Sequence, residues 1–255
     1  MIERLIALVT YANAILKGKA DTFDIDILIG HHCYNMEFIE PHSSNIPGST
    51  KIIAANANKW ISYLRDGNAE KVLLHFRKVN QFSLPDHITA AFIGGGSEWL
   101  IEVRYPSGSN LYTSATQGSG GRKDQVALID RNFSQSWASP SVIETRRALD
   151  EILGLLTDFA KEHEHSSHWS RTFEAAREAL AESQNQDLEF IPEGIYSLEA
   201  HHLIAAGFRS WVFGGMGSWN DMSFNDDAHE KYTVLTEQLY QAICSAFVAG
   251  VNSFP

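Results

Sequence analysis

The sequence predicts an α+β fold, in which an antiparallel sheet, formed by a meander and a hairpin, has helices packed on one side and a long C-terminal helix. Apolar residues recur at helical spacing near both ends of the chain, and the middle shows strand-like segments separated by Gly/Ser turns. No regular strand–helix–strand alternation is present, which argues against a parallel α/β sheet. With 255 residues, 44% of them hydrophobic and 20% charged, the chain has an ordinary globular composition.

The first part of the chain is expected to contain a helix, a strand pair and a second helix. Residues 2–17 place apolar side chains at helical spacing, and Gly18 ends the pattern. Alternation in 22–30 predicts a half-buried strand, with 35–40 as its hairpin partner. Residues 51–66 then return to helical spacing.

The middle of the chain is expected to form most of the sheet. Residues 70–79 are ambiguous between helix and strand. Segments 87–93, 98–106 and 111–117 predict a three-strand antiparallel meander, because Gly/Ser turns separate them. Residues 126–133 add one more strand.

The C-terminal half is expected to be mainly helical. Ser139 before Pro140 predicts the start of a helix, because a Ser cap and a Pro at the first helical position both suit a helix N-terminus. Asp227 and Glu230 form a capping-box-like pair at the start of the final helix, about 228–250. Three helical stripes are expected to face the core: Leu149, Ile152, Leu153, Leu156 and Phe159; Trp169, Phe173, Ala176, Arg177 and Leu180; and Leu235, Leu239, Ile243, Phe247 and Val251.

A single domain over 1–255 is expected, and the polar, Pro/Gly-punctuated segment 183–194 is the best linker candidate. Any seam falls near 184–194, between a main domain, 1–183, and a C-terminal unit, 195–255. That unit is expected to contain a short helix, a strand over 208–213, a glycine-rich loop and the final helix.

The charge of −11 argues against binding to nucleic acid, because an acidic protein repels the phosphate backbone. Residues 186–255 contain nine acidic and two basic side chains and so contribute −7. Two distant cysteines exclude a disulfide framework and a zinc–thiolate site. No apolar run is long enough to predict a membrane span. A cytoplasmic protein without a cofactor or a membrane partner is therefore expected.

The loop that begins at residue 212 has two interpretations. Phosphate binding is disfavoured, because "GGMGSWNDMS" lacks the P-loop lysine and Asn220 stands where a dinucleotide fingerprint needs its third glycine. Calcium is disfavoured, because the acidic residues do not have EF-hand spacing. Either Trp219 fills the core beside glycine turns, or the loop is an exposed contact surface. The surface would consist of Trp219, Asn220, Asp221, Met222, Phe224, Asp226 and Asp227.

The histidines supply the metal hypothesis. His163, His165 and His168 resemble the H-x-H-x-D-H signature of the metallo-β-lactamase superfamily, with Ser167 where the aspartate belongs. The resemblance covers six residues, and here a helix precedes the motif where that family has a strand, so membership is rejected. A zinc site of another kind stays open, because three imidazoles can ligate one ion.

Two functions follow from these observations. The first is a non-enzymatic cytoplasmic binding protein, such as an inhibitor or immunity-type protein, whose acidic and aromatic C-terminal surface captures a basic protein partner. The alternative is a hydrolase or metal-dependent enzyme that uses the three histidines, or a site assembled from His31, His32, Cys33 and the glycine-rich loop. No serine-hydrolase elbow is present to support the alternative.

Overall fold

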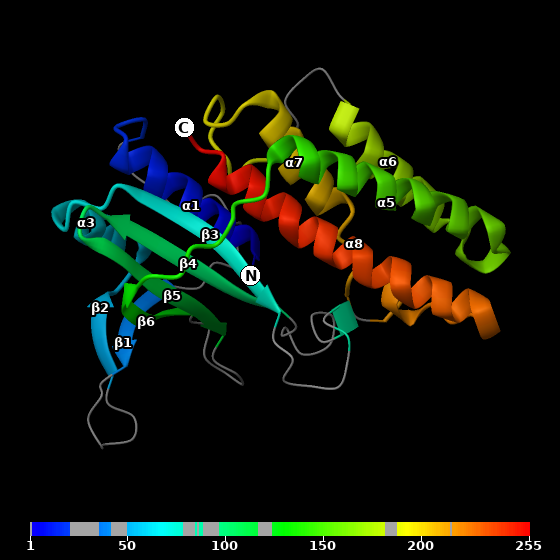
Figure 1. Cartoon of the computed structure of the whole chain (residues 1–255), viewed down its shortest axis with the longest axis horizontal. Coiled ribbons are helices and arrows are strands. Elements are labelled where there is room, and N and C mark those ends of the chain that lie inside the picture. The colour runs from blue at the N-terminus through cyan, green and yellow to red at the C-terminus, as the bar shows by residue number, and fades with distance from the viewer. Residues whose placement is uncertain are drawn as a thin grey trace.

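The protein has an α+β fold with a six-stranded sheet on one side and a group of helices on the other (Figure 1). This computed structural model describes residues 2–20, 36–41, 50–78, 85, 87–88, 97–116, 124–181, 188–214 and 216–255. The strands are β1 (Met36–Pro41), β2 (Thr50–Ala54), β3 (Lys71–Lys78), β4 (Ser97–Tyr105), β5 (Gly108–Thr116) and β6 (Asp124–Phe133). The helices are α1 (Ile2–Leu16), α3 (Ala57–Asp66), α5 (Val142–Glu162), α6 (Trp169–Ala181), α7 (Leu198–Arg209) and α8 (Asp226–Asn252), with short 3-10 turns η2 (Glu164–Ser166) and η3 (Trp219–Asp221).

The sheet has the order β2-β1-β6-β5-β4-β3. Two strands of the predicted meander, 98–106 and 111–117, are confirmed as the antiparallel neighbours β4 and β5, and β6 pairs antiparallel with β5. The first strand of the meander is not the expected 87–93, because β3 pairs with β4 instead. The ambiguous segment 70–79 supplies its first strand, β3. The strand expected at 87–93 begins instead with helical His87 and Ile88, and 89–93 lie outside the described residues.

The hairpin differs from the expected one. β1 pairs antiparallel with β2 and parallel with β6, whereas the expected partner, 22–30, lies outside the described residues. The helix expected over 51–66 was too long: residues 51–54 belong to β2, and α3 begins only after Asn56, whose side chain accepts a hydrogen bond from Lys59 N. The β-branched residues Ile52 and Ile53 favour a strand once β1 is available as a pairing partner. The helical periodicity of 51–66 gave no sign of that partner.

The expected C-terminal stripes are confirmed, with small corrections at the helix ends. All five stripe residues of α5 and of α8 are buried, but Arg177 of α6 is exposed and pairs with Asp150. Ser141, and not Ser139, caps α5, and Asn225 occupies the N-cap position of α8 without a side-chain cap, so the expected capping box is not formed. The strand expected at 208–213 is wrong, because α7 continues to Arg209 and no strand follows it.

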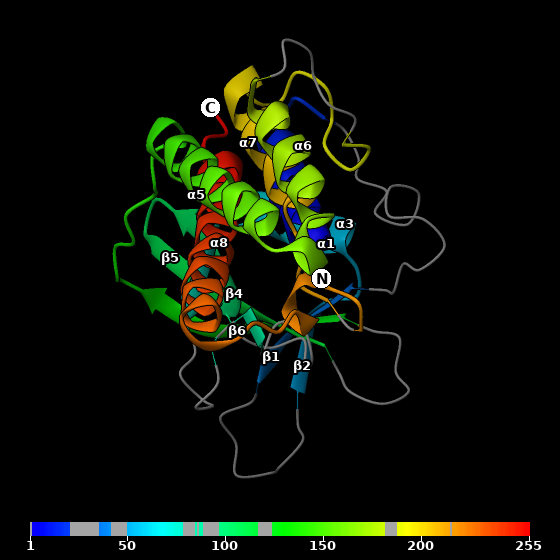
Figure 2. The ribbon, with the colours of Figure 1, turned by 90° about the vertical axis from the view of Figure 1, so that its right-hand side faces the viewer.

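The helices form two groups. Helices α1 and α8 pack against β3, and α3 packs against β1 and β2. Helices α5, α6, α7 and α8 form a four-helix bundle (Figure 2). Each helix contacts the next and α8 contacts α5, so the four helices are called the helical ring below. Helices α7 and α8 approach closely because Gly250 has no side chain: a Cβ there would lie 2.5 Å from Ile204 Cγ1. Helix α8 therefore belongs to both groups and joins the sheet to the ring.

The segment that connects β6 to α5 crosses the opposite face of the sheet, in front of β4 and β3 in Figure 1. Trp137 of this segment lies against His75 of β3, with 4.5 Å between the ring centroids. Leu73, Leu100 and Leu111 are buried without joining the main core cluster, so both faces of the sheet exclude water here.

The free edge of β3 is closed by two asparagine side chains. Asn13 of α1 donates to Val72 O at 2.7 Å and accepts from Val72 N at 2.8 Å. Asn252 of α8 makes the same pair of bonds with Leu74, both at 2.8 Å. Each amide replaces one residue of a neighbouring strand, so Val72 and Leu74 keep their backbone hydrogen bonds at the edge where α1 and α8 pack against β3.

One apolar cluster extends across the expected seam. Phe190 and Ile191, inside the linker candidate, are buried in the same cluster as Leu5 of α1 and Val251 of α8. This continuity favours a single domain, which stays a prediction. By length and composition α8 alone, among the described residues, resembles a membrane span, but 67% of its apolar window is buried inside the protein, as in the core helix of a soluble protein.

Candidate binding groove

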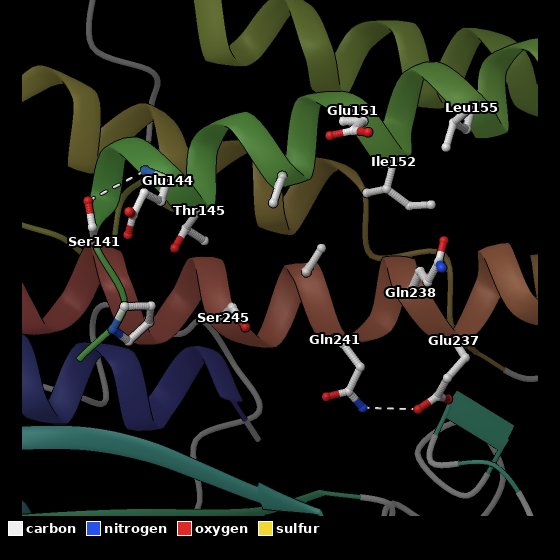
Figure 3. A pocket seen from close by; sticks show the side chains of 13 residues that line it. Ser141, Glu144, Thr145, Glu151, Ile152, Leu155, Glu237, Gln238, Gln241 and Ser245 are labelled. Atoms are coloured by element: carbon white, nitrogen blue, oxygen red, sulfur yellow. Dashed lines mark hydrogen bonds between the residues drawn. The ribbon is translucent and has the colours of Figure 1, made fainter. Parts of the chain in front are cut away.

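A groove lies between α5 and α8, on the outside of the helical ring (Figure 3). The two helices run antiparallel: Ser141 and Thr145 lie near Ser245 at one end, and Leu155 lies near Gln238 at the other. The groove has a volume of about 550 Å³. It is lined by Pro140, Ser141, Glu144, Thr145, Ala148, Glu151, Ile152, Leu155, Glu237, Gln238, Gln241, Ala242 and Ser245.

The α5 wall of the groove follows from the helical repeat. Glu144, Ala148, Glu151 and Leu155 follow one another at spacings of four, three and four residues, so they share one face of the helix. The neighbouring face carries the buried stripe that faces the interior of the ring. Leu155 remains 48% exposed at the groove's end, which leaves an apolar surface for a bound molecule to cover.

The groove is acidic. Glu144, Glu151 and Glu237 line it, and no Lys or Arg is among its described lining residues. Glu144 and Glu151 are exposed, and in the described part of the chain neither forms an ion pair. A cation entering the groove would therefore meet two carboxylates that have no competing partner.

Glu237 differs from the other two, because other parts of the chain hold it in place. Its carboxylate oxygens lie 2.8 Å from Lys78 Nζ and 2.9 Å from His87 Nδ1, and Gln241 donates a third hydrogen bond at 3.0 Å. Burial by itself raises the pKa of Glu237, but the bonds from His87, Lys78 and Gln241 outweigh it and lower the pKa to about 2. Glu237 is thus ionised, and Lys78 already balances its negative charge.

Of the two interpretations of the loop, the one in which Trp219 fills the core is confirmed, and the one in which Trp219 and Phe224 are exposed is wrong. Trp219 has 0% exposure, donates from Nε1 to Thr236 Oγ1 at 2.8 Å and packs against Phe173. Phe224 is also buried, at 8%. The loop is a structured turn: Gly217 has a φ of 84°, and its N–H donates to the Asp221 carboxylate. The aromatic residues plug one end of the helical ring, where α5, α6 and α8 meet.

The polar residues of the loop stay near the surface. Asp221, Asp226 and Asp227 are exposed, and Met222 and Asn220 are half-buried. Asn220 donates to His87 O at 3.1 Å and so ties the loop to the segment that also holds Glu237. A contact role for these acidic residues stays a prediction, but without aromatic anchors they offer only solvated charge.

The three histidines do not converge on one point. His163 and His165 both pack on Phe224, with ring centroids 6.3 Å apart, while His168 lies against Trp169. His165 Nε2 is 3.2 Å from Ser223 O. No group of three His, Cys, Asp or Glu side chains in the described part of the chain is placed to hold a metal ion, so the geometry gives no support to the zinc site left open by the sequence. His31, His32 and Cys33 lie outside the described residues.

A buried charged cluster on the sheet was missed by the sequence analysis. Glu102 is 3% exposed, lies 2.9 Å from His75 Nε2, and accepts hydrogen bonds from Arg104 Nε at 2.8 Å and Ser109 Oγ at 2.9 Å. These groups share one face because the β3–β4–β5 register aligns them. Trp137 packs on His75, and His75 and Glu102 are both buried, whereas the Arg104 side chain is 44% exposed.

This charged cluster predicts a loss of stability in acid. Burial by itself raises the pKa of Glu102, but the hydrogen bonds from His75, Arg104 and Ser109 outweigh it and lower the pKa to about 2. A carboxyl group whose pKa is lower in the folded state than in the unfolded state stabilises the fold at pH values above its unfolded pKa. This stabilisation is lost as the pH falls toward 2. Glu102→Gln should therefore be less stable than wild type near neutral pH, by about 1 to 3 kcal/mol.

The measurement is urea unfolding of both proteins between neutral pH and the acid range. The difference in free energy of unfolding between wild type and Glu102→Gln should decrease as the pH falls below the unfolded pKa of Glu102. A difference of constant size over this range would show that ionisation of Glu102 does not contribute to stability.

Comparison with known proteins finds no matching protein family, no matching curated protein and no matching solved structure.

Proposed function

We propose that this protein is a cytoplasmic, non-enzymatic binding protein that captures a basic segment of a partner protein in the groove between α5 and α8. The observation that carries the proposal is the lining of the groove: the exposed carboxylates Glu144 and Glu151 lie beside a partly apolar floor, while the third carboxylate, Glu237, is already paired with Lys78. Such a site suits a cationic segment, because charge speeds encounter and apolar contact slows release. An inhibitor or immunity-type role fits a protein that binds a basic partner.

The proposal keeps the acidic binding function expected from the sequence but moves its location. The α8 wall belongs to the strongly acidic C-terminal stretch, whereas Glu144 and Glu151 come from α5, outside that stretch. The aromatic anchors expected in the 219–224 loop are replaced by Ile152, Leu155 and the two groove alanines. The metal-dependent alternative is not carried forward, because its three histidines do not converge.

Neutralising Glu144 and Glu151 together should weaken binding of cationic peptides. The probe is an array of unstructured peptides that differ in net charge, applied to immobilised wild type and to the Glu144→Gln/Glu151→Gln variant. Wild type should retain the cationic peptides and release them as NaCl rises from about 0.05 to 0.5 M, because salt screens exposed charges. The variant should bind about tenfold more weakly, as expected for the loss of two ion pairs.

The matched control is Glu164→Gln/Glu178→Gln. It removes the same charge from exposed positions on η2 and α6, so it should leave retention close to wild type. If both double variants lose binding equally, the attraction depends on net charge and the groove is not the site. If wild type retains no cationic peptide at low salt, the proposed function is wrong.

A further inference from the structure

The two walls of the groove are helices, and this limits what can bind between them. The backbone groups in the middle of α5 and α8 are already paired within each helix. An extended peptide would therefore find no strand edge to pair with and would have to leave its own N–H and C=O groups to water. The N–H and C=O groups of a helical segment are already hydrogen-bonded to each other, so a helix loses the fewest backbone hydrogen bonds when it enters the groove.

The spacing of the lining residues along α5 and α8 fits the length of a bound helix. From Glu144 to Leu155 the α5 wall spans 12 residues, or about 16 Å along the axis, which is the length of about three helical turns. On α8, Gln238 and Ser245 are seven residues apart, so the opposite wall repeats over a similar length. Ala148 and Ala242 lie within these stretches, and their small side chains let a third helix approach closely.

The carboxylates then specify where the cations of that helix lie. Glu144 and Glu151 are seven residues apart, or about 10.5 Å along α5, and both are exposed. Two residues seven apart on a docked helix have the same separation and point in nearly the same direction. Glu237, on the other wall, is already neutralised by Lys78 and His87, so it contributes little to the choice of partner.

We infer that the basic segment is an amphipathic α-helix of about three turns, with two Lys or Arg residues seven positions apart facing Glu144 and Glu151. Apolar residues between the two cations pack on Ala148, Ile152 and Ala242, and one at the end of the helix covers Leu155. This inference rests on the proposed function, because it specifies the occupant of the same groove.

The test uses three synthetic peptides and the whole 255-residue chain. The first carries two lysines seven positions apart with leucines between them. The second has the same composition with the lysines five positions apart, which places them on different faces. The third is the first peptide with a central proline, which prevents a continuous helix. Fluorescence anisotropy gives each Kd, and circular dichroism measures peptide helicity.

The first peptide should bind at least about tenfold more tightly than the other two. Glu144→Gln/Glu151→Gln should remove its preference over the second peptide, whose lysines differ only in spacing, while Glu164→Gln/Glu178→Gln keeps that preference. Equal affinity for all three peptides, with cationic array peptides still retained, would overturn the helical occupant and leave the proposed function intact. Failure of every cationic probe, structured or not, would overturn both.

Discussion

Trp219→Ala is expected to lower the free energy of unfolding by about 3 to 5 kcal/mol, the range for a large aromatic residue removed from a core. Trp219 is fully buried, and its ring lies 5.2 Å from those of Phe173 and Tyr232. Its removal would leave a cavity between α5, α6 and α8 and would leave the Thr236 hydroxyl without its indole donor. Urea denaturation followed by circular dichroism measures the loss.

The same loop provides the control. Met216 is 99% exposed, so Met216→Ala should change stability by less than about 0.5 kcal/mol. Trp219→Phe should fall between the two, because it keeps an aromatic ring but loses the bond to Thr236. A loss below about 1 kcal/mol for Trp219→Ala, accompanied by weaker binding of cationic peptides, would instead support the loop as a contact surface.

Asn13→Ala is expected to cost about 2 to 4 kcal/mol of stability, because it leaves a buried donor and a buried acceptor without partners. Both groups belong to Val72 on the edge of β3, and Asn13 is 1% exposed. Asn252→Ala should have a similar effect at Leu74, where Asn252 makes the equivalent pair of bonds. Denaturant unfolding measures both losses.

Amide hydrogen exchange can distinguish the loss of the side-chain hydrogen bonds to β3 from a simple loss of packing. In Asn13→Ala the Val72 amide should exchange much faster than in wild type, while the Leu74 amide, held by Asn252, should keep most of its protection. Asn252→Ala should show the reverse order. Asn132→Ala, at an exposed position of β6, should leave both amides and the stability nearly unchanged. Unaltered Val72 exchange in Asn13→Ala would contradict the edge-closing role.

Local patterns in the sequence were sufficient to predict most individual elements. Leu149, Ile152 and Leu153 repeat at helical spacing, and the structure buries all three on α5. The strands β4, β5 and β6 follow from β-forming residues between turn signals. These predictions succeeded because periodicity and turn chemistry depend on residues that are close together in the chain.

The binding groove was not predicted, because its two walls come from helices about a hundred residues apart in the sequence. Glu144 and Glu151 had the appearance of ordinary solvated charge, and the spacing of four and three residues along α5 was the only local signal for a shared face. The loop at Trp219 was equally undecided, because the same glycines suit either a buried turn or an exposed contact surface.

The sequence by itself determined the α+β class, the long terminal helix and the acidic character of the protein, because these depend on composition and on short-range periodicity. Only the tertiary structure decided that Trp219 is buried, that Asn13 and Asn252 close a strand edge, and that three carboxylates surround one groove. Each of these depends on which surfaces of distant elements pack together, and that packing is a property of the whole chain.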